Sequence, residues 1–163
     1  MELEYISFWD QKVDEMEPAD FFESFNEVKE SQPMVYLMIG IMKKTIGNDF
    51  AYIGFLRFFY IVWRCLETAD ARVRTQKLEI EDLRRNVVKT TQMLVYVGGS
   101  DDIEEINAVL YHFTLEHRQA ALLSYVMGGI MSEDKIFPVA TGVRYQIVTW
   151  LWGVITTFDE QMD

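Results

Sequence analysis

The side chains whose spacing could bind a metal lie in one segment, which holds both histidines of the chain. Glu105, His112 and Glu116 stand at i, i+7 and i+11, so they share one stripe of a helix. The Glu-x-x-His pair of di-iron bundles is absent, and so is His-Glu-x-x-His. The spacing favours a surface ion pair between His112 and Glu116. We therefore expect no metal and no other cofactor.

Catalytic nucleophiles and phosphate loops have little support in the sequence. Cys65 lies in an apolar stretch without a general base next to it, and no Gly-x-Ser-x-Gly elbow occurs. Neither Gly-Gly pair, at 98–99 or 128–129, is followed by the Lys-Ser/Thr of a phosphate loop. No catalytic residue is predicted. An enzyme whose site is assembled from dispersed residues stays an alternative, because such a site leaves no local motif.

A row of carboxylates is the best candidate for a binding surface. Pro18 opens a predicted helix that extends to about Ser31. One face of this helix is apolar: Phe21, Phe22, Phe25 and Val28. The opposite face carries an acidic row: Asp20, Glu23, Glu27 and Glu30. This pattern is typical of an amphipathic helix with a solvated side, and it also fits a surface that binds a basic partner.

The charge of the chain is unevenly distributed. The formal net charge is −11, and residues 1–31 hold ten acidic and two basic side chains. Residues 43–89 hold ten basic and six acidic side chains. An acidic surface repels the phosphates of nucleic acids and favours basic partners. We expect no nucleic acid partner, and the basic middle could be neutralised by the acidic N-terminal segment.

The segment Asp49–Leu66 is apolar around almost its whole circumference when it is drawn as a helix. Such a helix is buried in a core or in a membrane. Arg57 and Arg64 argue against a membrane, because a charged side chain is costly at the centre of a membrane helix. The two arginines stand seven residues apart, on one stripe. They are predicted to form a strip that faces solvent or ion pairs with a neighbouring acidic helix or, alternatively, an anion-binding site.

The sequence predicts an all-α fold, a single domain over residues 1–163. It is an irregular bundle of about six helices around the buried central helix Asp49–Leu66. The other helices are predicted at 18–31, 33–46, 78–97, 101–131 (continuous or bent near His117) and 139–158. Residues 1–16 form a strap or a short helix. The wide apolar face of 139–158 predicts a fully internal helix or a homodimer interface.

The lone cysteine fits a reducing compartment, and the acidic N-terminus lacks the features of a signal peptide. No clean apolar span of membrane length is found. We therefore expect a cytoplasmic protein.

The leading functional hypothesis is a non-enzymatic adaptor, inhibitor or antagonist that binds a basic protein surface through the acidic row, with self-association through 139–158. The second hypothesis is a helical domain that holds an apolar small molecule. Its pocket would be lined by Met38, Met42, Phe55, Phe59 and Trp150. The third is the enzyme with dispersed residues.

Overall fold

The computed structural model describes residues 3–162, apart from the side chains of Ile103 and Asn107. Over these residues the chain forms eight α-helices, one short 3-10 helix and no strand, which confirms the all-α class. The elements are α1 (Leu3–Asp14), α2 (Pro18–Ser31), α3 (Pro33–Ile46), α4 (Asp49–Ala69), η1 (Ala71–Arg74), α5 (Ile80–Gly98), α6 (Ile103–Leu115), α7 (Ala120–Ser132) and α8 (Thr141–Gln161).

The described helices outnumber the six that were predicted for two reasons. The N-terminal segment forms a full helix, α1, and the segment predicted at 101–131 divides into α6 and α7. None of the described helices combines the length and the hydropathy that a membrane crossing requires.

Local chemistry fixes the start of α4. Gly47 has a φ of 64°, the left-handed conformation that ends α3. The Asn48 side chain then accepts a hydrogen bond of 2.9 Å from the backbone N–H of Ala51 and caps α4. The direction of α4 relative to α3 is therefore set within a two-residue turn.

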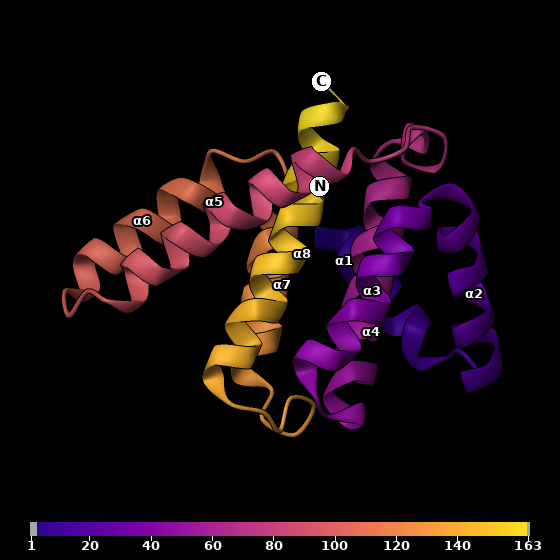
Figure 1. Ribbon diagram of the computed structural model, residues 1–163, viewed down its shortest axis with the longest axis horizontal. Coiled ribbons are helices and arrows are strands. Elements are labelled where there is room, and N and C mark those ends of the chain that lie inside the picture. The colour runs from indigo at the N-terminus through magenta and orange to yellow at the C-terminus, as the bar shows by residue number, and fades with distance from the viewer. Residues whose placement is uncertain (1–2, 163) are drawn as a thin grey trace.

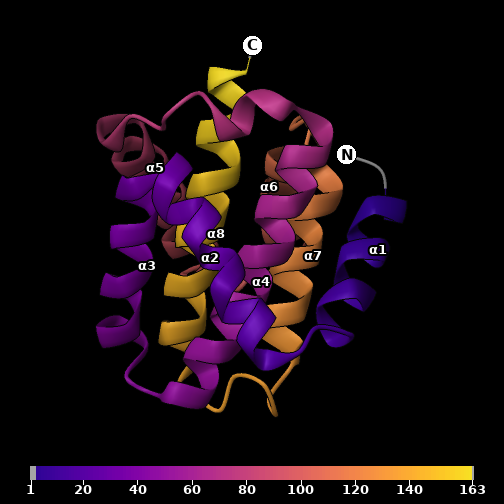
Figure 2. The same cartoon turned by 90° about the vertical axis from the view of Figure 1, so that its right-hand side faces the viewer.

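The core of the molecule is built between α4 and α8, which pack against each other (Figures 1 and 2). Each of these two helices has twelve buried residues, so both are covered on most sides. α1 and α3 pack on α4, whereas α5 and α7 pack on α8. α2 packs beside α3. The pair α5 and α6 projects from this body as an arm (Figure 1).

Candidate functional site

The acidic row lies on the exposed side of α2. Asp20, Glu23, Glu27 and Glu30 are all exposed. The opposite side of the helix is buried through Phe21, Phe25 and Val28. Since the row extends over eleven residues of one helix, with ten rises of about 1.5 Å, it is about 15 Å long. The carboxylates are therefore displayed in a fixed line on the surface.

Aromatic packing holds α2 in place. The ring centroid of Tyr60 on α4 lies 5.7 Å from that of Phe21 and 6.2 Å from that of Phe25. Phe25 also contacts Phe59, with ring centroids 6.1 Å apart. Aromatic pairs at these separations stabilise a contact beyond the area they bury. The row is thus mounted on a helix whose inner face is fixed to α4.

A buried glutamine holds the end of α2. The amide nitrogen of Gln32 donates to the backbone carbonyls of Val73 (3.0 Å) and Gln76 (2.7 Å). Its amide oxygen accepts from the backbone N–H of Leu78 at 2.8 Å. Gln32 therefore connects the junction of α2 and α3 to η1 and to the segment that follows it.

One end of the acidic row meets a network of charges. Arg64 Nη1 lies 3.1 Å from a carboxylate oxygen of Glu27 and 2.8 Å from one of Glu67. Glu67 also pairs with Arg74 at 3.0 Å, and its side chain is only 7% exposed. Glu27, Glu30 and Glu67 line a hollow of about 420 Å³ together with Arg74 and Ser31.

Among the described residues, Glu27 is the member of the acidic row that forms an ion pair, although Glu30 shares the hollow with Arg74. Within the described part of the chain, no lysine or arginine forms an ion pair with Asp20, Glu23 or Glu30. These three carboxylates therefore remain available to an external cation.

The sequence placed Phe22 on the buried side of α2, but its side chain is 52% exposed. It is offset by about 100° from Phe21 around the helix, which moves it off the buried stripe. It therefore adds an exposed apolar group to the helix that carries the acidic row. The same angular offset in the sequence could have identified it.

Arg57 is bound by the acidic N-terminal helix. Its Nη2 lies 2.6 Å from Oδ1 of Asp10, and its Nη1 pairs with Asp14. The hydroxyl of Tyr125 donates to the same Asp10 oxygen at 2.8 Å. Burial lowers the pKa of Arg57, but the interactions with Asp14 and Asp10 outweigh this and leave the pKa raised. The sequence did not single out Asp10, which lies 47 residues away in the chain.

Arg64, the second member of the predicted arginine stripe, is also fully engaged. Its Nε donates to the hydroxyl of Tyr60 at 3.1 Å, and its guanidinium lies 5.5 Å from the ring centroid of Trp9. Both arginine side chains, which belong to α4, thus bind residues of α1, α2 or α4 itself. An anion-binding role for them stays a prediction.

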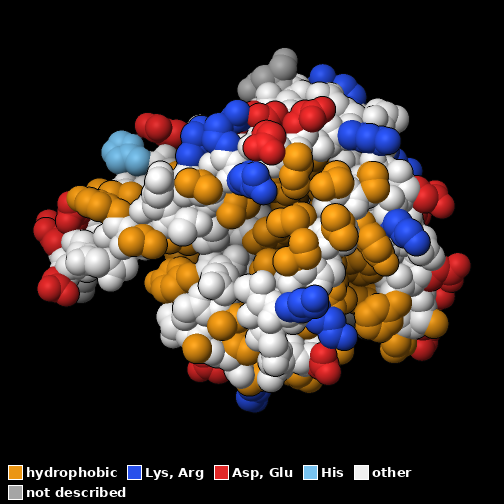
Figure 3. All heavy atoms as spheres, in the orientation of Figure 1, with side chains coloured by type: hydrophobic (Ala, Val, Ile, Leu, Met, Phe, Trp, Pro, Cys, Tyr) orange, Lys and Arg blue, Asp and Glu red, His pale blue; other side chains and the backbone are white. Residues whose placement is uncertain are grey.

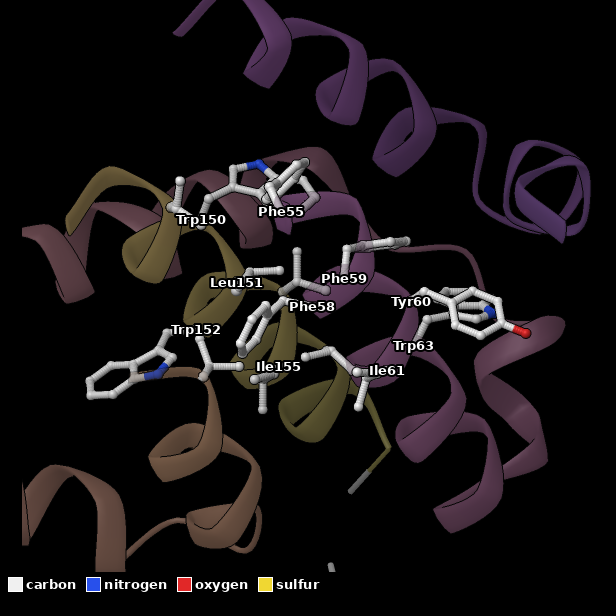
Figure 4. Close-up of a cluster of buried hydrophobic side chains, with 14 of the residues drawn as sticks. Phe55, Phe58, Phe59, Tyr60, Ile61, Trp63, Trp150, Leu151, Trp152 and Ile155 are labelled. Atoms are coloured by element: carbon white, nitrogen blue, oxygen red, sulfur yellow. The ribbon is translucent and has the colours of Figure 1, made fainter. Parts of the chain in front are cut away.

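The residues of the predicted apolar pocket pack against one another in the core. Phe55 and Phe59 are fully buried, and their ring centroids lie 5.4 and 5.8 Å from that of Trp150 (Figure 4). Met42 is buried, and Met38 is partly exposed at the edge. A ligand among these rings would have to separate contacts that already exist.

The helix predicted at 139–158 corresponds to α8, whose apolar side chains are buried within the chain. Trp152 donates its indole N–H to the carbonyl of Leu123 at 2.9 Å and stacks on Phe113, with ring centroids 5.1 Å apart. Thus α5, α6 and α7 contact this helix from within the same chain. A homodimer through it stays a prediction.

The residues considered for metal binding are dispersed. Glu105 accepts hydrogen bonds from Tyr96 and Ser100, whereas His112 pairs with Glu116 at 3.4 Å. Between residues 3 and 162, no group of three or more histidine, cysteine or acidic side chains is arranged to hold a metal ion.

The chain matches no family model, no curated protein and no solved structure. Its function therefore has to be inferred from the geometry of its own residues.

Proposed function

We propose that the chain is a non-enzymatic interaction protein that binds a basic protein surface through α2. The observation that supports this proposal is the acidic row itself: four exposed carboxylates on one helix, three of them without a cation among the described residues. The inner side of the same helix is fixed by Phe21 and Phe25. Little conformational freedom would be lost when a partner binds, which favours affinity.

The partner that fits this surface carries lysines or arginines along about 15 Å, the length of the row. Phe22 offers an apolar contact on the same helix. Aromatic side chains are enriched among the residues that dominate binding energy, whereas exposed charges mainly set the association rate and the specificity. We therefore assign the steering of the partner to the acidic row and the apolar contact to Phe22.

The test compares two double variants that change the net charge equally. Glu23→Lys with Glu30→Lys reverses the row and leaves the ion pair between Glu27 and Arg64 intact. Asp101→Lys with Glu104→Lys reverses two exposed carboxylates near the tip of the arm. The immobilised full chain captures partners from extract at low and high salt, and the recovered partner is titrated against each variant.

We expect capture to weaken with salt, because the screening length is about 8 Å at physiological ionic strength. The variant with the reversed row should lose binding, and the arm variant should keep most of it. Circular dichroism checks that both are folded. Equal affinity of the two folded variants would refute the proposal, since the effect would then be one of net charge and not of the row.

The two alternatives gain no specific support from the structure. An apolar ligand in the predicted pocket would have to part the contacts between Trp150 and its neighbouring rings. We also propose the cytoplasm as the location, because the chain has a single cysteine, Cys65, which is free, and this fits a reducing compartment.

A further inference from the structure

α3 exposes apolar side chains along one side. Met34 is 41% exposed, Leu37 55% and Ile41 47%, with Met38 partly exposed between them. These four residues, called the α3 stripe below, stand at i, i+3, i+4 and i+7 and so follow one face of the helix. Figure 3 shows hydrophobic side chains gathered over α3 and beside it toward α8, with lysine and arginine side chains around the edge.

The inner side of α3 is already used. Val35, Ile39, Met42 and Ile46 are buried in the core. A helix that is apolar on both sides is expected to be covered on both sides. Single exposed apolar residues are ordinary, but a contiguous exposed apolar patch marks an interaction site. The i, i+3, i+4, i+7 spacing is the one by which helices anchor to each other.

The two ends of the α3 stripe differ in charge. Lys44 lies in the last turn of α3 at the edge of the stripe, at the negative end of the helix dipole. Lys43 stands on the other side of the helix and pairs with Asp49 at 3.6 Å. At the other end, Gln32 binds the N–H of Leu78, which brings the segment with Glu79 beside the start of α3. The exposed Glu79 forms no ion pair with any other described residue. Each end of the stripe is thus complementary to the opposite end.

We propose that the α3 stripe is the interface of a homodimer in which the α3 helices of two copies pack antiparallel around a two-fold axis near Leu37. This arrangement places Lys44 of each copy toward Glu79 of the other. A parallel arrangement would instead bring the two copies of Lys44 together and align the two helix dipoles. In a two-fold interface the same patch serves both copies, which the self-complementary ends of α3 permit.

α8, the helix at first predicted to dimerise, is less suited to this role because its apolar side is covered within the chain. α2 lies beside α3 (Figures 1 and 2), and the exposure of Leu37 and Ile41 shows that the rest of the chain leaves the stripe open. The dimer would therefore present two copies of α2. Two linked binding surfaces can engage a partner with more than one basic site far more tightly than one surface can.

The first experiment measures the mass of the full chain by sedimentation velocity over a wide range of concentration. We expect a dimer, and Leu37→Lys should raise its dissociation constant by about a hundredfold or more, because a symmetric interface loses the leucine twice. Tyr111→Lys, on α6, changes an equally exposed apolar residue outside the stripe and should leave the dimer intact. A chain that is monomeric at every concentration, or a dimer that survives Leu37→Lys, would overturn the proposal.

The second experiment tests the direction of packing by disulfide formation. The buried Cys65 is not expected to react, which the unmodified chain will verify. Leu37→Cys lies near the axis and should link to itself across the dimer. Met34→Cys should not, because the two copies of residue 34 would be offset by about 10 Å along the helices, beyond disulfide reach.

A mixture of the Met34→Cys and Ile41→Cys chains should link, because antiparallel packing places residue 34 opposite residue 41. Self-linking of Met34→Cys, or a dimer in which none of these pairs links, would refute the antiparallel α3 interface.

Discussion

Two adjacent glycines on α7 allow the packing of the core to be measured directly. Gly128 is exposed, and a Cβ built there has no neighbour within 4 Å. A Cβ at Gly129 would instead overlap with the far end of the Phe58 ring. That ring is only 4% exposed, and it lies against Tyr125 and Phe137 with centroid separations of 5.2 and 5.7 Å. It has little room to move aside.

Replacing either glycine by alanine gains roughly 0.5–1 kcal/mol, because glycine is unfavourable within a helix. Gly128→Ala should therefore stabilise the chain. Gly129→Ala has the same gain but also overpacks the core, which typically costs about 1–3 kcal/mol. Since the helix term cancels between the two variants, their difference isolates the packing cost. We expect Gly129→Ala to be less stable than Gly128→Ala by about 1–3 kcal/mol.

Thermal and urea unfolding, followed by circular dichroism, measure this difference. For a chain of this size each kcal/mol corresponds to about 2–4 °C in melting temperature. Phe58→Leu in the Gly129→Ala background completes a double-mutant cycle, and a favourable coupling would assign the cost to the Phe58 contact. Equal stability of the two alanine variants would show that the ring yields freely, and the reasoning about a tightly packed junction of α4 and α7 would be wrong.

Two further predictions follow from buried polar groups. Gln32→Ala leaves two backbone carbonyls and the Leu78 N–H without their partner, so the free energy of unfolding should fall by about 3 kcal/mol. Urea unfolding measures this change. A loss no larger than that of a typical surface substitution would contradict the role of Gln32. Burial lowers the pKa of His117 in the folded chain, although Asp159 opposes this shift. Neutral His117 therefore contributes its full stability above about pH 6.5, the pKa of a histidine in the unfolded chain. This contribution is lost as the pH falls through the lower pKa of the folded chain. The melting temperature of His117→Gln should then fall less than that of the unmodified chain between about pH 7 and pH 5, and parallel curves would exclude the effect.

Helix positions were predicted well where proline or glycine marks a boundary. The predicted ranges 18–31 and 33–46 agree with α2 and α3 at both ends. Proline suits the first turn of a helix, and Gly47 supplies the left-handed residue that ends α3. α4 runs three residues past the predicted Leu66, to Ala69, because no such residue stops it there.

The division of 101–131 into α6 and α7 could not be located from local sequence. No proline or glycine lies between Leu115 and Ala120. The junction is instead held by a residue from α8: Asp159 lies 3.5 Å from His117 and 3.3 Å from Arg118. A bend whose cause lies some forty residues away leaves no signal within a local window.

The candidate surfaces divide in the same way. The acidic row was found because charge and helical period agree: four carboxylates on one side can only face solvent or a cation. For Arg57, the sequence predicted ion pairs or an anion site. The ion pairs depend on Asp10 and Asp14, which lie far away in the chain, so no local pattern could show them.

The α3 stripe could not be predicted from the sequence, because here the apolar residues show no helical period. Residues 34–42 are apolar on every side, so their period cannot show which face is buried. Only the packing of α3 on α4 and α8 determines that Val35 and Ile39 face inward while Leu37 and Ile41 face solvent. The helix has more apolar surface than one chain covers. Where local composition and the fold disagree in this way, function is a better explanation than chance. For α3, the disagreement would disappear in the proposed dimer, in which a second copy covers the stripe.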